Sequence, residues 1–238
     1  MTTTLFKTLG AATTLAGIIA TAGSASAASL SYTSSTAFET TDIENSILGV
    51  QKFNSSLGTL QKVTLNFVGD LTGNAEFENK SRNASTITVK LNANLSLSQP
   101  DLVPQTPLLL DPENLYTYQV AAYDGTDDKA GASGRKINTL AATKSTTSVF
   151  TDTQFLQAFT GTGNIDFLFS AFANSIVTGS GNISSGIETL AKASVTVTYE
   201  YEEAKTVPES STVLGLGLIA GLGLLSQRKQ NWLKTSGS

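Results

Sequence analysis

The chain has 238 residues, of which 40% are hydrophobic and 14% charged, and its formal net charge is −4. This length allows one large domain or two small ones, and the apolar content is enough to bury a core. Because the chain has no Cys and no His, disulfides, zinc sites built on those residues and Ser-His-Asp triads are excluded, and the acidic balance argues against a nucleic-acid partner.

The N-terminal residues have the pattern of a secretory signal. A lysine near the start is followed by an apolar run over 9–22, and then by Ala25 and Ala27 in the A-x-A pattern that precedes signal-peptidase cleavage. The run is too short and too rich in Thr and Gly for a membrane helix. We therefore predict that residues 1–27 are a signal peptide and that Ala28 becomes the mature N-terminus.

Residues 28–206 are dominated by β-strand patterns. Apolar and polar residues alternate with a period of two, which places one set on the core face and the other toward solvent. The apolar positions of the four clearest runs are Val63, Leu65 and Phe67; Ile87, Val89, Leu91, Ala93, Leu95 and Leu97; Ile165, Phe167, Phe169, Ala171 and Ala173; and Ala193, Val195, Val197, Tyr199 and Tyr201. Further strands are expected over 116–122 and near 30–33, 37–41, 75–78 and 148–150.

Breaks rich in Gly, Asn and Asp separate these runs and favour turns at 69–74, 124–125, 161–164 and 179–182. One helical turn is expected over 152–159, with Asp152 as its cap. About eight or nine short strands separated by turns favour an all-β fold, an antiparallel β-sandwich, with a closed β-barrel as the alternative.

The same region resembles an exported bacterial domain family called choice-of-anchor E. The resemblance is carried by the segments 51–60 (QKFNSSLGTL) and 121–127 (AAYDGTD), the turns 159–163 and 179–182, and the strand 195–199. Members of that family join this domain to one of several surface anchors, and the domain has no assigned molecular activity. The resemblance therefore implies a cell-surface location and a β architecture, without a defined chemistry.

The C-terminal residues have the order of parts of a sorting signal, with a polar motif, an apolar stretch over 213–225 and a basic pair. The stretch would form a helix of about 20 Å, which is short of the ~30 Å hydrocarbon core, and the basic pair would stay on the cytoplasmic side. The polar motif is Val207, Pro208, Glu209 and Ser210, and the basic pair is Arg228 and Lys229.

This layout resembles the PEP-CTERM signal of exported bacterial proteins, which an exosortase, a membrane-embedded cysteine protease, recognises. Ser210 stands where that family most often has a second Pro. The resemblance implies that residues 207–230 are a sorting signal that enters the inner membrane transiently, followed by a tail at 231–238. A plain membrane anchor without cleavage is the alternative.

The densest group of carboxylates is Asp124, Asp127 and Asp128. Calcium binds several oxygen ligands, and a turn of this composition can supply them, although the spacing differs from an EF-hand loop. The alternative is a hairpin turn in which Asp side chains stabilise the backbone. Calcium is the one cofactor that the sequence suggests.

No pair of carboxylates stands out for acid–base chemistry, so we predict no catalytic residue and no enzyme activity. The first hypothesis is a structural or interaction module of the cell surface or extracellular matrix. The alternative is a carbohydrate-binding module assisted by calcium, with Tyr123 as the candidate for stacking on a sugar. The expected partners are signal peptidase, an exosortase, the membrane through the C-terminal helix, and extracellular polysaccharide.

Overall fold

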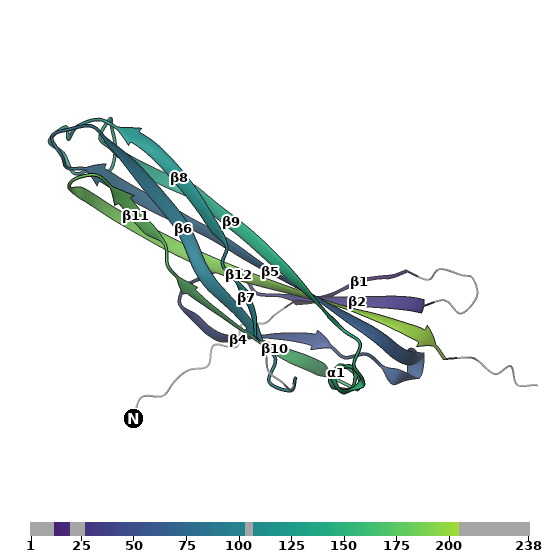
Figure 1. Ribbon diagram of the computed structural model, residues 1–238. Coiled ribbons are helices and arrows are strands. Elements are labelled where there is room, and N and C mark those ends of the chain that lie inside the picture. Colours follow the sequence, from purple (N-terminus) through teal and green to yellow (C-terminus); the bar gives the residue numbers. More distant parts are fainter. Residues whose placement is uncertain (1–11, 20–26, 103–106, 205–238) are drawn as a thin grey trace, which may run out of the picture. The chain divides into compact units, whose positions relative to one another are not determined.

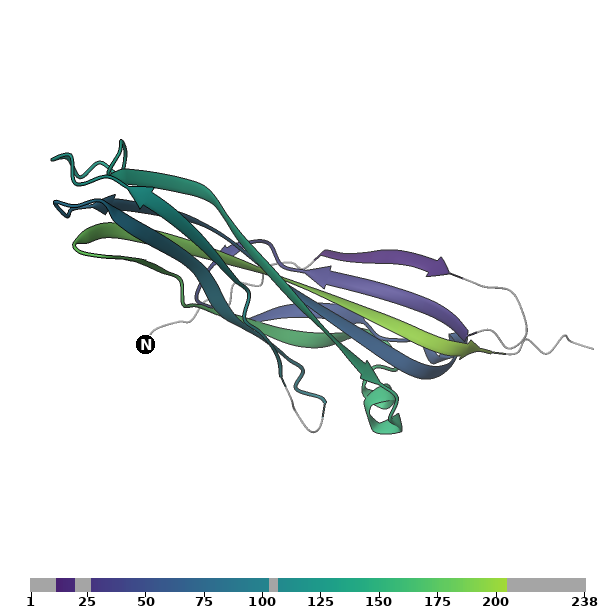
Figure 2. The same cartoon turned by 45° about the horizontal axis from the view of Figure 1, so that its top comes forward.

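The protein is described by a computed structural model that covers residues 12–19, 27–102 and 107–204. The strands form two sheets in which all pairings between strands are antiparallel. Figures 1 and 2 show the two sheets lying one over the other. This confirms the predicted antiparallel sandwich, since neither sheet closes into a barrel within the described residues.

Sheet 1 has the strand order β1-β2-β12-β5-β9, and β3 also pairs with β12. The strands are β1 (Ala12–Ile19), β2 (Ala27–Ser35), β3 (Glu39–Thr40), β5 (Gly58–Asn79), β9 (Gly134–Phe150) and β12 (Ile183–Glu203).

Sheet 2 has the order β11-β6-β10-β4, and the short strands β7 and β8 pair with β6. The strands are β4 (Ile43–Gln51), β6 (Ser85–Ser98), β7 (Leu108–Leu110), β8 (Glu113–Val120), β10 (Asn164–Ala173) and β11 (Ile176–Gly179). A 3-10 turn, Ser55–Leu57, precedes β5, and the helix α1 (Thr153–Ala158) follows β9.

The core lies between the sheets, where the alternating positions place it. All the apolar residues predicted to face inward are buried except Ala173, which is half-buried at the end of β10. At one end of the core, the ring of Tyr199 contacts Phe53 and Phe159. The Tyr199 hydroxyl donates a 2.8 Å hydrogen bond to the carbonyl of Gln51, and so links β12 of sheet 1 to β4 of sheet 2. Burial, together with nearby Tyr32, raises the pKa of Tyr199.

The predicted turn at 69–74 is wrong, because β5 runs through it without a break. Its glycines serve close packing instead: a Cβ on Gly69 would lie 2.2 Å from Leu95 Cδ1, and one on Gly73 would lie 2.3 Å from the carbonyl oxygen of Glu188. The expected strand at 75–78 is therefore the end of β5. In contrast, Gly125 (φ 104°) and Gly181 (φ 89°) have the positive φ expected of the predicted turns.

Four strands were missed and others are longer than predicted. The sequence did not indicate β1, β4, β7 or β11, and it indicated only the last residues of β9 and the second half of β12. The helical turn is present as α1, with Asp152 at its N-cap position, but the Asp152 side chain makes no capping hydrogen bond.

Only one of the two predicted processing sites falls within the described residues, namely the cleavage site at Ala27. β1 falls within the predicted signal peptide, and it pairs only with β2, which starts at Ala27. β12 ends at Glu203, four residues before the predicted sorting motif. Ala25, the sorting motif, the stretch 213–225, the basic pair and the tail lie outside the described residues. No helix among the residues that are described has the length and apolar character needed to cross a bilayer.

The alternation gives a direct test of the core. Val197 is fully buried, so Val197→Asp places a carboxylate without a partner between the sheets and should lower the free energy of unfolding by about 3 to 5 kcal/mol. Ser194→Asp, on the outer face of the same strand, should cost about 1 kcal/mol or less. Chemical denaturation followed by circular dichroism measures both. Equal stability of the two variants would contradict the assignment of faces.

Candidate functional site

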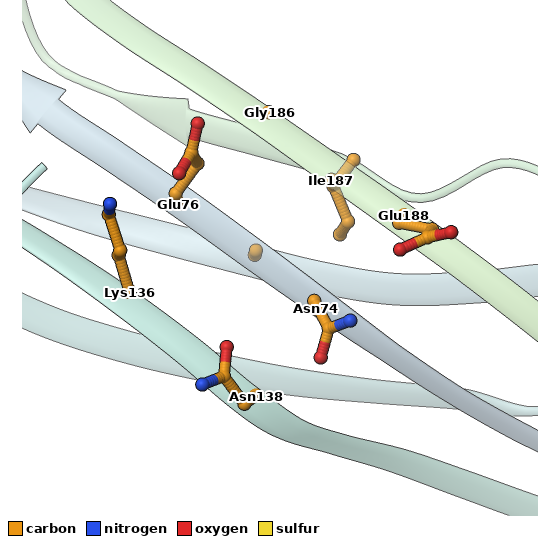
Figure 3. A pocket seen from close by; sticks show the side chains of 8 residues that line it. Asn74, Glu76, Lys136, Asn138, Gly186, Ile187 and Glu188 are labelled. Carbon is orange, nitrogen blue, oxygen red and sulfur yellow. The ribbon is translucent and has the colours of Figure 1, made fainter.

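A hollow of about 330 Å³ lies on the outer face of sheet 1. Its side chains come from three neighbouring strands, and Figure 3 shows them around an open depression. The polar lining residues are Asn74 and Glu76 from β5, Lys136 and Asn138 from β9, and Glu188 from β12.

Local irregularities of the strands make this hollow. The register of β5 against β9 shifts between Gly73 and Ala75, so Asn74 sits at a bulge. On the other side of β5, Gly186 pairs with Glu76, and a Cβ built on Gly186 would come no closer than 3.7 Å to its neighbours. The missing side chain therefore leaves the space above Glu76 open.

The hollow offers hydrogen-bonding groups beside an apolar surface of nearly equal extent. Two carboxylates, two amides and one ammonium group line it, and Ile187 adds an apolar edge. Such a set can donate to and accept from the hydroxyl groups of a polar ligand. Sequence reasoning missed it because its residues are spread over three strands and only the strand register brings them together.

The predicted calcium residues are in one loop, between β8 and β9, and their carboxylates are engaged by the protein itself. Asp124 accepts a hydrogen bond from the backbone N–H of Thr126, and Asp128 accepts one from that of Ala130. Asp127 forms ion pairs with Lys80 and Lys129. These contacts are those of the alternative interpretation, in which Asp side chains stabilise the turn. The part of the chain that the structure covers contains no group of three acidic side chains arranged to hold a metal ion.

A buried carboxylate that the sequence did not reveal lies near this loop. Glu78 is fully buried at the end of β5, and neither of its carboxylate oxygens has a hydrogen-bond partner among the described residues. Gly134 makes room for it, since a Cβ there would lie 2.2 Å from Glu78 Oε2. Neither Glu78 nor Gly134 lines the hollow described above.

The tyrosines contribute mainly to the fold. Tyr199 and Tyr201 are buried, and the Tyr116 hydroxyl exchanges hydrogen bonds with the backbone of Ala141. Tyr123, the residue predicted to stack on a sugar, is half-buried, and Lys80 Nζ lies 6.0 Å from the centre of its ring. Tyr123 therefore lies beside the acidic loop and is not part of the hollow.

Comparison with known proteins adds no family. No family model matches the chain, and no curated protein does. Among solved structures, chains from the Gx and Gt strains of infectious bursal disease virus align at 14% and 13% identity with TM-scores of 0.12 and 0.10. They cover 85% and 91% of this chain, and this chain spans about half of theirs, 49% and 53%. Likeness at this level carries no argument about fold or function.

The ion pairs of the acidic loop predict a pH response. Hydrogen bonds from Lys129 and from Lys80 lower the pKa of Asp127 to about 2. A carboxyl with a lowered pKa stabilises the fold above its unfolded pKa of about 4, and this contribution is lost as the pH falls through about 2. We expect an NMR titration of the Asp127 carboxyl to have its midpoint near pH 2.

Removing the ammonium group of Lys129 should reverse the lowering of the Asp127 pKa. Lys129→Met should raise the Asp127 midpoint toward the ordinary value. Lys144→Met should leave it unchanged, because Lys144 lies against the carbonyl of Asp111 instead. A wild-type midpoint near pH 4 would show that the ion pairs do not hold in solution.

Proposed function

We propose that this protein is an exported, non-catalytic β-sandwich module of the bacterial cell surface or extracellular matrix, sorted by an exosortase. The observation that carries the proposal is the position of the two predicted processing sites relative to the sandwich. The signal-peptidase site falls at the first residues of β2, and the sorting motif begins four residues after β12 ends.

Both cuts would leave the core and every described strand except β1 in place. Removal of residues 1–27 takes away β1, whose only pairing among the described strands is with β2. Cleavage near Pro208 and Glu209 falls after the last described strand, β12. Because the core and every described pairing except that of β1 with β2 lie between the two processing signals, the domain is suited to release as a folded unit, which supports an exported module over a membrane-embedded one.

A row of half-buried or exposed hydroxyl and amide side chains on the outer face of sheet 1 supports an interaction role. In the register of this sheet, Thr33 of β2 lies beside Thr196 of β12, Thr196 beside Asn66 of β5, and Asn66 beside Thr147 of β9. The row has no charged residue and crosses four strands. It gives the module a polar, neutral surface for contact with matrix components.

Sorting is tested by following the C-terminus. A tag placed after Gln230 should be lost from the mature protein in wild-type cells, because cleavage near Pro208 and Glu209 separates it from the sandwich. A strain without exosortase should keep the tag in the inner membrane. The double variant Pro208→Ala, Glu209→Ala should do the same and melt like the wild type, since both residues lie beyond β12. Retention of the tag in wild-type cells would favour the plain membrane anchor.

The hollow on sheet 1 favours a second candidate function, binding of a carbohydrate. Its amides and carboxylates suit the hydroxyl groups of a sugar. Under this candidate, exopolysaccharide from the producing bacterium retains the protein on a column. Gly186→Leu, which fills the hollow, should lower retention at least about tenfold, corresponding to the loss of a few hydrogen bonds.

The matched control is Ser145→Leu, on β9 but outside both the hollow and the neutral row, which should leave retention unchanged. A parallel run with a chelator tests calcium at the acidic loop, where Asp124, Asp127 and Asp128 lie. Loss of retention with the chelator would assign calcium a role. Failure of the column to retain the wild-type protein would exclude the carbohydrate candidate and leave the structural module.

A further inference from the structure

β2 would become an edge of sheet 1 if β1 were removed, and it is unlike the edge strands that the structure describes. The sequence of β2 is AASLSYTSS, with no charged residue and no proline. Proteins protect exposed strand edges with charges, prolines, bulges or shortness, because an open edge pairs with other chains. β2 has neither a charged side chain nor a proline, and the structure shows no register shift where it pairs with β12.

The remaining edges have these protections. On the opposite side of sheet 1, β9 carries Arg135, Lys136 and Lys144 and a register shift against β5. In sheet 2, β4 contains Glu44 and a register shift against β10, β8 begins with Glu113, and β7 and β11 have only three and four residues. Without β1, β2 would therefore be the edge strand of more than four residues that has neither a charged side chain nor a proline.

The side of β2 that faces away from β12 accepts an antiparallel strand. β1 pairs with it from Ala12 opposite Ser35 to Ile19 opposite Ser29, with a register shift between Leu15 and Ile18 of β1, and Figure 1 shows β1 beside β2. β1 lies within the predicted signal peptide. After cleavage at Ala27, the backbone N–H and C=O groups of β2 that face β1 lose their partners, and the newly formed N-terminus is β2 itself.

We propose that a second copy of the mature chain occupies this edge, with the two β2 strands paired antiparallel about a two-fold axis. This inference rests on the proposed removal of residues 1–27. An antiparallel partner is the kind that the edge already accepts. The second copy is the occupant we infer because its β2 would have the same length, the same newly exposed edge and no charged side chain to repel its mate.

The alternation of β2 restricts the register. Leu30 is buried and Tyr32 packs partly against the core, whereas Ser31 and Thr33 lie on the outer face. If the two-fold axis passes beside Ser31 or beside Tyr32, that residue lies opposite its own copy, and inner residues face inner residues. Moving one β2 strand by one residue from either register would place Leu30 opposite an outer hydroxyl. Pairing about Ser31 matches Ala28 with Ser34 and uses the whole strand from the mature N-terminus.

The dimer would have one continuous sheet with the order β9-β5-β12-β2 followed by β2-β12-β5-β9 of the second copy. On the outer face of this sheet, the neutral row of one copy, which begins at Thr33, would lie next to the neutral row of the second copy. Leu30 and Tyr32, which removal of β1 leaves at an open edge, would gain neighbours from the partner. The dimer thus satisfies both the backbone groups and the apolar side chains that processing exposes.

The test uses the full chain, expressed with its signal in a host that exports it and purified after processing. N-terminal sequencing establishes whether cleavage occurred at Ala27. Sedimentation velocity over a range of concentrations should then show a dimer. Because the chain has no cysteine, Ser31→Cys introduces a single thiol at the axis, which a short bis-maleimide should link to that of the second copy.

The variant Ser31→Lys, Thr33→Lys should weaken dimerisation at least about tenfold, since like charges meet across the axis in both allowed registers. The matched control is Val149→Lys, Thr147→Lys. In the register of sheet 1, Val149 lies in the same row as Ser31, and Thr147 lies in the same row as Thr33. Both control residues are on β9, at the opposite edge of the sheet. The control should dimerise as the wild type does, and thermal melting should show both variants folded.

The outcomes separate this inference from the proposed function. An intact Met1 on the purified protein would contradict export and removal of the signal. A processed chain that stays a monomer at all concentrations would overturn the dimer while leaving export in place. A dimer that the β9 control weakens as strongly as the β2 variant, or that Thr147→Cys cross-links in place of Ser31→Cys, would also overturn it.

Discussion

The pairing of β5 with β12 is the interaction on which the rest of sheet 1 depends. It runs from Gly58 opposite Glu203 to Asn79 opposite Ile183, which is almost the whole length of both strands. β5 offers its other side to β9, and β12 offers its other side to β2 and β3. This one long pairing therefore determines which residues of β9, β2 and β3 lie side by side across sheet 1. The hollow and the neutral row are both products of that register.

Period-two patterns predicted the strands that are buried on one face and regular throughout. β6, β10 and the second half of β12 meet this condition, because nearly every second residue enters the core. β9 and β4 do not. The buried residues Ile137, Leu140 and Ala142 of β9 are spaced by three and then two, since the strand has a register shift against β5. Asn45 of β4, with φ 52°, interrupts that strand near a register shift against β10. A bulge changes which face the next residue takes, so a strict alternation cannot detect it.

In the candidate sites too, the sequence predicts contacts within a short segment, and it does not predict contacts between distant segments. The acidic loop is local: Asp124 and Asp128 bond to backbone groups two residues further on, which their position in the sequence suggests. Lys80, the other partner of Asp127, comes from a distant segment that only the fold brings close. The hollow is wholly assembled, because no short segment contains its lining. The role of Gly69 and Gly73 was misread for the same reason, since the atoms they accommodate belong to Leu95 and Glu188.

The strands β9 and β2 of sheet 1 differ in charge, and the difference fits the role proposed for each. β9 remains an edge throughout the life of the chain, and it carries the positive charges that discourage pairing with other strands. β2 would be an edge only after the proposed removal of β1. A charge facing outward on β2 would be compatible with the sheet, as Glu200 on the neighbouring strand shows by pairing with Lys62. The absence of charged side chains along the whole of β2 is therefore not imposed by the core. Under the proposed processing, a strand covered in the precursor and paired with a second copy afterwards would have reason to stay neutral, because the charged groups that protect an edge from aggregation also keep a specific partner away.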